Sequence, residues 1–179
     1  MVGKFLFGLI FIFLVSFGSW HYYFSDKTIF TKGIIDFSSL EFSNGGLIPQ
    51  SFTCDGKDIS PSYSIERVPL DAKSLVIMVE DTDAPSLFTH YLLFNVDPQI
   101  GVINQSTTPD FSVVGTNDYG KQEYNGPCPP IGSHRYRFKV LALNKFLDLD
   151  ETAKRSDIDK AVKGGIIAKG EFWGEYTKN

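Results

Sequence analysis

Residues 135–140 read Arg-Tyr-Arg-Phe-Lys-Val and show the clearest alternation of charged and apolar side chains in this chain. Successive side chains of a β-strand point to opposite faces of a sheet. The alternation therefore places Tyr136, Phe138 and Val140 on one face and the three cations on the other. We predict a strand here, with one face buried in a core and the other in contact with solvent.

Four further short apolar runs, bounded by Gly, Pro, Asn and Asp, predict additional strands. They span residues 34–42, 74–79, 91–96 and 166–172. One helix is expected at residues 157–163, with Ser156 as its N-cap and Gly164 and Gly165 at its end. Strands at near-regular spacing with one late helix predict a mainly β protein, an antiparallel β-sandwich with the short C-terminal helix at its edge.

The composition limits the classes of protein to which the chain can belong. Its 179 residues, 42% of them hydrophobic, suffice for one domain with a packed core. A formal net charge of -4 without a basic cluster argues against a nucleic-acid partner, because nucleic-acid affinity comes mostly from clustered cations. Two cysteines are too few for a disulfide scaffold and lack the CxxC spacing of a structural zinc site.

The N-terminal segment differs from the rest of the chain. Residues 5–15 are all apolar, and no charged side chain occurs between Lys4 and Asp26. Residues 1–24 are predicted to be either a secretory signal peptide, cleaved near residues 16–18, or an uncleaved membrane anchor. Either segment would export the protein to the periplasm or hold it at a membrane, facing outside the cytoplasm. Residues 25–41 would then be a lead-in to a domain at residues 42–179.

A first polar patch, Glu-Asp-Thr-Asp-Ala-Pro at residues 80–85, directly follows a predicted strand. In an extended chain Asp81 and Asp83 point the same way, so both carboxylates would share one rim of the sheet. Alternatively, the segment is an Asx-type turn closed by Pro85. Both interpretations remain open for the two acids.

A second patch occupies residues 126–136, where three prolines and two glycines predict a stiff loop that leads into the alternating strand. His134 and Tyr136 are two residues apart on that strand and so face the same side, where an imidazole and a phenol can line one cavity. The alternative is that His134 satisfies a loop carbonyl while Tyr136 belongs to the core. His90, at the start of an apolar run, carries the same two interpretations.

Five short motifs occur in order along the chain. They are Ser60-Pro61, Asp-Thr-Asp-Ala-Pro at residues 81–85, His90 before an apolar strand, Asn-Asp-Tyr-Gly at residues 117–120, and residues 126–136. This pattern resembles the phosphatidylethanolamine-binding protein family, and in particular its bacterial and archaeal Raf kinase inhibitor-like branch. The similarity runs from about residue 42 to residue 176. It implies a β-sandwich with a small cavity that binds anions such as phosphate, acetate or a phospholipid head group.

The resemblance also implies roles for individual residues. The cavity would be lined by Asp81, His90, His134 and Tyr136, with Asp83, Pro85 and Gly126 as candidate rim residues. The Ala84–Pro85 bond is a candidate for cis geometry. The chain departs from the family pattern at Thr82, which replaces a proline, and near Phe88, where relatives carry a tryptophan just before the histidine.

The residue types indicate what such a cavity binds. Two imidazoles and a phenol offer hydrogen-bond donors to an oxyanion, whereas Asp81 suits an ammonium group or orients a histidine. A phosphoethanolamine-like zwitterion satisfies both signs of charge. Two histidines and a carboxylate also match a metal ligand set, but the resemblance is to a metal-free pocket, so we predict neither a metal nor another cofactor.

Two classes of function remain. We predict an exported binding or modulator protein that binds a small anion or a phospholipid head group. This protein could also inhibit a protein partner. We assign no catalytic residue. The alternative is a hydrolase in which His90 or His134 acts as general base.

Cys54 and Cys128 are the only cysteines, and each lies in a turn-rich stretch beside a motif of the family. Export would place them in an oxidising compartment. We predict a Cys54–Cys128 disulfide, with two buried free thiols as the alternative.

Overall fold

The structure is a computed structural model that describes residues 33–178. The predicted leader at residues 1–24, and the lead-in up to residue 32, lie outside the described residues. The described elements are β1 Asp36–Ser39, β2 Gly46–Leu47, the 3-10 helix η1 Gln50–Phe52, β3 Tyr63–Glu66, β4 Ser74–Asp81, β5 Phe88–Val96, β6 Val102–Ile103, β7 Val113–Val114, β8 Ser133–Leu143, α2 Arg155–Ala161 and β9 Ile166–Thr177.

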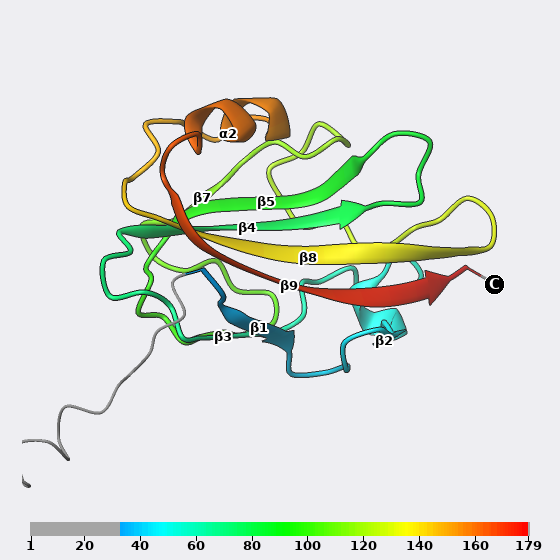
Figure 1. Ribbon diagram of the computed structural model, residues 1–179. Coiled ribbons are helices and arrows are strands. Elements are labelled where there is room, and N and C mark those ends of the chain that lie inside the picture. The colour runs from blue at the N-terminus through cyan, green and yellow to red at the C-terminus, as the bar shows by residue number, and fades with distance from the viewer. Residues whose placement is uncertain (1–32, 179) are drawn as a thin grey trace, which may run out of the picture. The chain divides into compact units, whose positions relative to one another are not determined.

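The strands form two sheets, as Figure 1 shows. The larger sheet has six strands in the order β2-β9-β8-β4-β5-β7, and the smaller has three in the order β1-β3-β6. All pairs are antiparallel except β2 with β9, which is parallel. The predicted mainly β sandwich is therefore confirmed, with one short parallel pair that the sequence did not indicate.

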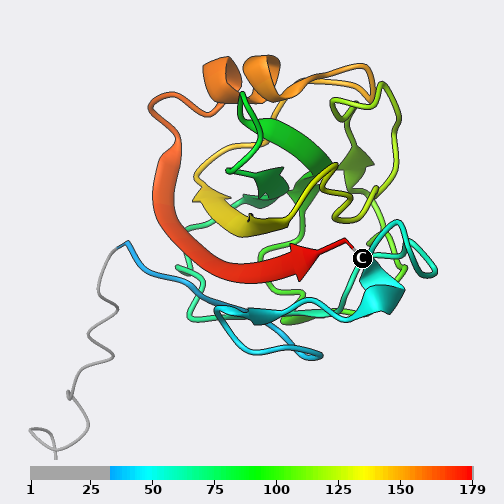
Figure 2. The same ribbon diagram turned by 90° about the vertical axis from the view of Figure 1, so that its right-hand side faces the viewer.

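The two sheets enclose the main core. Along β8, Tyr136, Phe138 and Val140 are completely buried against the smaller sheet, as their alternation predicts. The ring of Phe138 stacks on Phe172 of β9 at a centroid distance of 4.6 Å. Figure 2 shows the curvature of β9 and the N-terminal strand beneath it. The aromatic core holds the end of β8, which carries His134 and Tyr136, in a fixed position.

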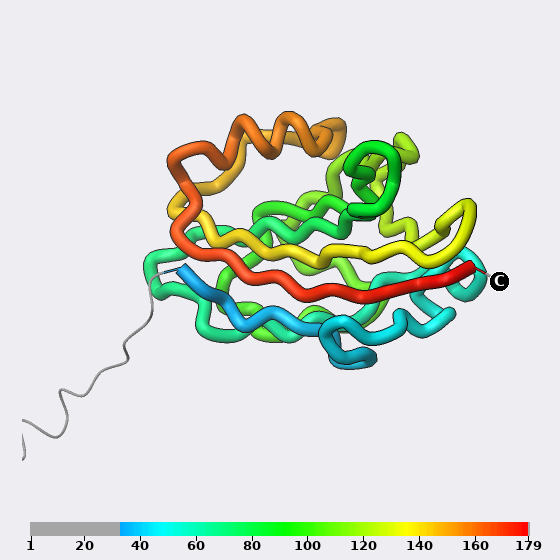
Figure 3. Tube along the Cα trace, turned by 45° about the vertical axis from the view of Figure 1, so that its right-hand side comes forward, coloured from blue at the N-terminus to red at the C-terminus, as the bar shows by residue number. Residues whose placement is uncertain are grey.

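The short C-terminal helix α2 packs on the outer face of the six-stranded sheet (Figure 3). Ile158 of α2 and Val162, directly after the helix, pack with Val76 of β4 and with Leu92 and Phe94 of β5 in a second cluster. The helix lies on this face because the side chains that β4 and β5 direct outward are apolar.

The first residue and the N-cap of α2 differ from the prediction. The helix begins at Arg155, and the side chain of Asp157 accepts a hydrogen bond of 3.1 Å from the backbone N–H of Lys154. Ser156 therefore lies inside the first turn and is not the N-cap. The helix stops before Gly164, whose φ of 71° is in the left-handed region that favours glycine.

The predicted disulfide is present, with the Cα atoms of Cys54 and Cys128 5.4 Å apart. It joins the segment after η1 to the stiff loop before β8, and the N–H of Cys54 also donates to the carbonyl of Pro127 at 3.1 Å. No helix found within residues 33–178 has the length and apolar character needed to span a bilayer.

Candidate functional site

Asp81 is the last residue of β4 and organises the turn that follows. It is 5% exposed, and its Oδ1 accepts hydrogen bonds from the backbone N–H groups of Asp83 at 2.9 Å and Ala84 at 3.0 Å. This is an Asx-type turn, and its acceptor is Asp81. The turn thus fixes the direction of the second carboxylate oxygen.

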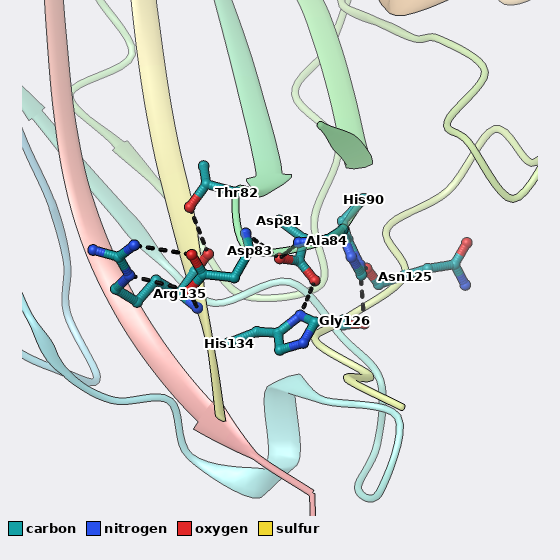
Figure 4. A network of polar contacts seen from close by, with 9 residues as sticks. All are labelled: Asp81, Thr82, Asp83, Ala84, His90, Asn125, Gly126, His134 and Arg135. Atoms are coloured by element: carbon teal, nitrogen blue, oxygen red, sulfur yellow. Dashed lines mark hydrogen bonds and ion pairs between the residues drawn. The ribbon is translucent and has the colours of Figure 1, made fainter. Parts of the chain in front are cut away.

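That second oxygen, Oδ2, forms a hydrogen bond with the imidazole of His134. Figure 4 shows the imidazole below Asp81, with Nδ1 of His134 2.7 Å from Oδ2 of Asp81. Because an ionised carboxylate only accepts, Nδ1 carries the proton and Nε2 is left for another partner. The sequence left a loop carbonyl as one partner for His134. The structure gives it Asp81 instead.

His90 reaches the same place because β5 contains a β-bulge. Val79 of β4 is opposite Tyr91, but the next residue, Glu80, is opposite Thr89, so that His90 is the extra residue. Strict alternation would turn His90 away from the face that carries Tyr91. The bulge re-aims the ring, whose centroid lies 5.3 Å from that of Tyr136 in an edge-to-face contact.

Two backbone carbonyls hold the His90 ring. Its Nδ1 lies 2.8 Å from the carbonyl oxygen of Asn125 and 3.1 Å from that of Gly126, so Nδ1 carries a proton that it donates to them. Burial lowers the pKa of His90, although both carbonyls and the charge of Asp81 oppose this effect. His90 is therefore neutral at pH 7, and its Nε2 is a hydrogen-bond acceptor.

Tyr136 is completely buried, and its hydroxyl makes no well-aligned hydrogen bond in the described part of the chain, although the Cys128 backbone and the Asp81 carboxylate lie near enough to affect its pKa. Burial and then the charge of Asp81 raise its pKa, so the hydroxyl stays protonated. A buried polar atom without a partner is uncommon in native structures and requires an explanation. A ligand oxygen would supply the missing acceptor.

Aromatic rings surround His90 on its remaining sides. The rings of Phe88 and Tyr119 lie 5.2 Å and 5.5 Å from the His90 ring, and 4.9 Å from each other. Phe88 therefore places an aromatic ring directly beside His90. Tyr119 is 46% exposed, so these rings connect the buried imidazole to the surface.

Two of the candidate rim residues, Asp83 and Pro85, have different environments. Arg135 holds the carboxylate of Asp83 through its backbone N–H at 2.9 Å, Nε at 3.0 Å and Nη2 at 2.9 Å. These hydrogen bonds lower the pKa of Asp83 to about 2. Pro85 is exposed in the turn, and the expected cis bond is wrong, because the Ala84–Pro85 peptide is trans.

The backbone of Gly126 holds the His90 ring and is itself held by Asp58. Besides accepting from His90, it donates its N–H to Oδ1 of Asp58 at 2.6 Å. A Cβ at this position would overlap the carbonyl oxygen of Phe52, so only glycine fits. Gly126 is buried, so its carbonyl and not its surface contributes to the site.

Sequence reasoning missed two residues that complete the arrangement. Asp58 has no motif around it, and it meets Gly126 only through a contact 68 positions away in the chain. Asn117 belongs to the quoted Asn-Asp-Tyr-Gly motif but received no role. Its Nδ2 donates to the carbonyl of Glu123 at 2.9 Å and to Oδ1 of Asn125 at 2.8 Å, which shapes the loop that holds His90.

The four predicted lining residues therefore come together at one end of the six-stranded sheet. Asp81, His90 and Tyr136 are buried, whereas the side chain of His134 is 14% exposed. Asp81 is engaged by three internal donors, so each of its two oxygens already accepts at least one hydrogen bond. Within residues 33–178, no group of three or more His, Cys, Asp or Glu side chains is arranged to hold a metal ion.

Comparison with known proteins agrees with this geometry. The family model described as phosphatidylethanolamine-binding protein matches residues 38–177. A UPF0098 protein of Archaeoglobus fulgidus is 44% identical over 77% of this chain, and the chain spans 50% of that protein's length. A UPF0098 protein of Methanothermobacter thermautotrophicus is 41% identical over 76% of this chain and 95% of its own length.

Two solved structures share the fold. A phosphatidylethanolamine-binding protein homologue of Chlamydia trachomatis has a TM-score of 0.78 and 36% identity, covering 82% of this chain and 99% of the other. Escherichia coli YbcL, described as a new member of the mammalian family, has a TM-score of 0.76 and 26% identity, covering 81% and 99%. The family match over most of the chain and the shared sandwich place this chain in the phosphatidylethanolamine-binding protein family.

Proposed function

We propose that this chain is an exported binding protein that takes a phosphate group, free or as part of a phospholipid head group, at Asp81, His90, His134 and Tyr136. The buried hydroxyl of Tyr136, which lies near Asp81 but makes no well-aligned hydrogen bond, is the observation that carries the proposal. A hydroxyl left unsatisfied in the interior costs about 1–3 kcal/mol. A ligand oxygen at this position would recover that energy.

The free atoms of the site match a singly protonated phosphate. His134 has given Nδ1–H to Asp81, so its Nε2 donates a charge-assisted bond whenever the ring is protonated. Tyr136 adds a neutral donor. His90 is neutral and offers Nε2 as an acceptor, which suits the O–H of a protonated phosphate oxygen. We therefore expect two donors and one acceptor to contact the phosphate, while both oxygens of Asp81 already accept hydrogen bonds.

The mouth of the site suits the positive end of a zwitterion. Burial raises the pKa of Tyr119, and the charges of Asp58 and Asp81 raise it further, so both carboxylates act on this ring. The faces of Phe88 and Tyr119 can attract a cation. An ethanolamine ammonium here, with its phosphate at His134 and Tyr136, would use both parts of the site.

Export and a partner complete the proposal. The disulfide is a feature of oxidising compartments, in agreement with a leader at residues 1–24 that acts as a signal peptide or as a membrane anchor. A protein partner would meet the loop before β8, where Ile131 is 84% exposed. Occupancy of the adjacent site would then modulate that contact.

Calorimetric titration of the full chain with inorganic phosphate and with phosphoethanolamine tests the site. Both should bind near neutral pH, where His90 is neutral and its Nε2 accepts a hydrogen bond. Tyr136→Phe should weaken binding about tenfold, the effect of losing one hydrogen bond to a charged ligand. Tyr63→Phe is the matched control, because Tyr63 is the other buried tyrosine without a hydroxyl partner in the described residues and lies in the core. Absence of binding, or equal affinities for the two variants, would overturn the assignment.

The Asp81–His134 pair also supports the hydrolase alternative, since a carboxylate on Nδ1 orients an imidazole as a general base at Nε2. Turnover of generic ester and phosphoester substrates distinguishes the two functions. Activity that is lost in a His90→Ala, His134→Ala double variant would favour catalysis. Equal rates for both proteins would remove it.

A further inference from the structure

One tripeptide outside the Asp81 site has the form that directs the attachment of sugar to an asparagine. Residues 104–106 read Asn-Gln-Ser, which is the only Asn-x-Ser or Asn-x-Thr sequence in the chain. In exported proteins the asparagine of such a tripeptide accepts an oligosaccharide when the middle residue is not proline. A tripeptide this short also arises by chance, so its position in the fold decides whether it can act as an acceptor.

The fold places this tripeptide in a turn at the surface. Asn104 directly follows β6, and Asn104, Gln105 and Ser106 are all exposed. The carbonyl of Asn104 accepts the N–H of Thr107 at 3.3 Å, which closes a four-residue turn. Ser106 is the third residue of this turn, and its φ of 57° is in the left-handed region that type II turns require there. The asparagine is therefore accessible in the folded chain.

Hydrogen bonds hold the backbone of the turn against the start of β3. The N–H of Gln105 donates to the hydroxyl of Ser62 at 3.0 Å, and the N–H of Ser106 donates to the carbonyl of Ser60 at 3.1 Å. Both bonds use backbone N–H groups of the turn. A sugar on the side chain of Asn104 would therefore leave them intact, and the folded domain can carry the modification.

The turn adjoins an open edge of the smaller sheet. In the strand order β1-β3-β6, β6 is an outer strand, so one side of its backbone has no strand partner within residues 33–178. Val102 on this strand is 44% exposed. An open edge with an exposed apolar side chain can pair with another chain and lead to aggregation. A bulky, polar oligosaccharide on Asn104, two residues after Val102, would screen this edge.

We propose that Asn104 is an N-glycosylation site that receives an oligosaccharide from a lipid-linked phosphate donor. The inference rests on export, which is part of the proposed function, since this modification belongs to exported proteins. In the reaction, Nδ2 of Asn104 forms a bond to the anomeric carbon of the sugar. The bond from that carbon to the phosphate oxygen of the lipid carrier breaks, the lipid phosphate leaves with the electron pair, and one amide proton passes to the transferase. The pattern also requires a hydroxyl two residues later, which Ser106 supplies.

Peptide mass spectrometry of the chain isolated from the cells that naturally make it tests the proposal. The peptide that contains Asn104 should show a mass increase of one oligosaccharide, and fragmentation should locate the sugar on Asn104. Asn104→Gln and Ser106→Ala, each produced in the same cells, should lose this mass increase completely. Gln105→Ala is the matched control, because it alters the same turn, keeps the acceptor sequence and should retain the sugar.

Three results would overturn the proposal. These are an exported chain without sugar on Asn104, a sugar found only on a hydroxyl of residues 106–108, or equal modification of the wild type and Ser106→Ala. Thermal melting of each variant shows whether it is folded. Cell fractionation of the same samples separates this proposal from the export on which it rests. An unmodified chain in the cytoplasm would contradict both, whereas an unmodified chain outside the cytoplasm would contradict glycosylation alone.

Discussion

His134 on β8 and Asp81 on β4 share a hydrogen bond of 2.7 Å between Nδ1 and Oδ2, although 53 positions separate them in the chain. The same carboxylate receives the two N–H groups of the turn through its other oxygen. One side chain therefore both shapes the turn after β4 and orients the imidazole. These two roles can be separated by substitution.

Asp81→Asn keeps the turn acceptor and replaces the oxygen that faces His134 by an N–H₂ group, which cannot accept from Nδ1–H. We expect the free energy of unfolding to fall by about 1–3 kcal/mol and phosphate binding to be lost. Urea unfolding and calorimetry measure the two effects. Asp97→Asn is the control, because Asp97 accepts one turn N–H, from Gln99 at 2.8 Å, and pairs with no histidine among residues 33–178. Identical behaviour of both variants would contradict an orienting role for Asp81.

Gly126→Ala tests whether the backbone behind His90 must approach so closely. The new Cβ would meet the carbonyl oxygen of Phe52 and would lie 2.8 Å from the carboxylate of Asp58. Displacing the chain should cost about 1–3 kcal/mol and move the carbonyl that holds His90, so phosphate affinity should also fall.

Gly101→Ala provides the comparison for that variant. Gly101 has a φ of 65° and open space around its Cβ position, so an alanine there meets only backbone strain of about 1–2 kcal/mol. Its phosphate affinity should equal that of the wild type. If Gly126→Ala also left phosphate affinity intact, the proposed dependence of His90 on this carbonyl would be wrong.

The Asp83–Arg135 pair predicts a small, acid-sensitive contribution to stability. Arg135 lowers the pKa of Asp83 to about 2, below the usual value of about 3.9 for an aspartate in an unfolded chain. The contribution is therefore present above about pH 4 and disappears as the pH falls through about 2. Because the pair is at the surface, we expect less than about 1 kcal/mol.

Urea unfolding of Asp83→Asn, Arg135→Gln and the double variant as a function of pH measures this contribution. Each single variant should be slightly less stable than the wild type near neutral pH, and the double variant no less stable than either. All differences should vanish in strong acid. A difference that persists below about pH 2 would point to a cause other than this ion pair.

The part of the site on β8 was predictable because alternation is a local property. Tyr136 is buried, and His134 shares its face, as expected from their spacing of two along one strand. The apolar runs also located β4 and β5, but they ended at Val79 and began at Tyr91. Both strands continue through polar residues to the site, because backbone pairing extends the ladder beyond the apolar run.

The remaining features depend on partners distant in the sequence. The face of His90 is set by a bulge, which arises from the register between β4 and β5 and not from the residues of β5 alone. Asp58 joins the site only through a long-range contact with Gly126. The sheet face that α2 covers follows from the packing of Ile158 and Val162 on strands much earlier in the chain. Local patterns carry no information on such contacts.

The Cys54–Cys128 disulfide predicts that stability and ligand binding respond together to reduction. The bond closes a loop across 74 positions, for which chain entropy gives an upper figure of roughly 4 kcal/mol. Cys128 lies two residues after Gly126, whose carbonyl holds His90, so reduction should free that loop and weaken phosphate binding as well as lower the melting temperature. Thermal melting and calorimetry with and without reductant measure both effects.

A Cys54→Ala, Cys128→Ala double variant should resemble the reduced protein and show no further response to reductant. Two reactive thiols in the unreduced, denatured chain would rule out the bond. Unchanged phosphate affinity in the reduced protein would show that the Asn125 and Gly126 carbonyls keep their positions without it.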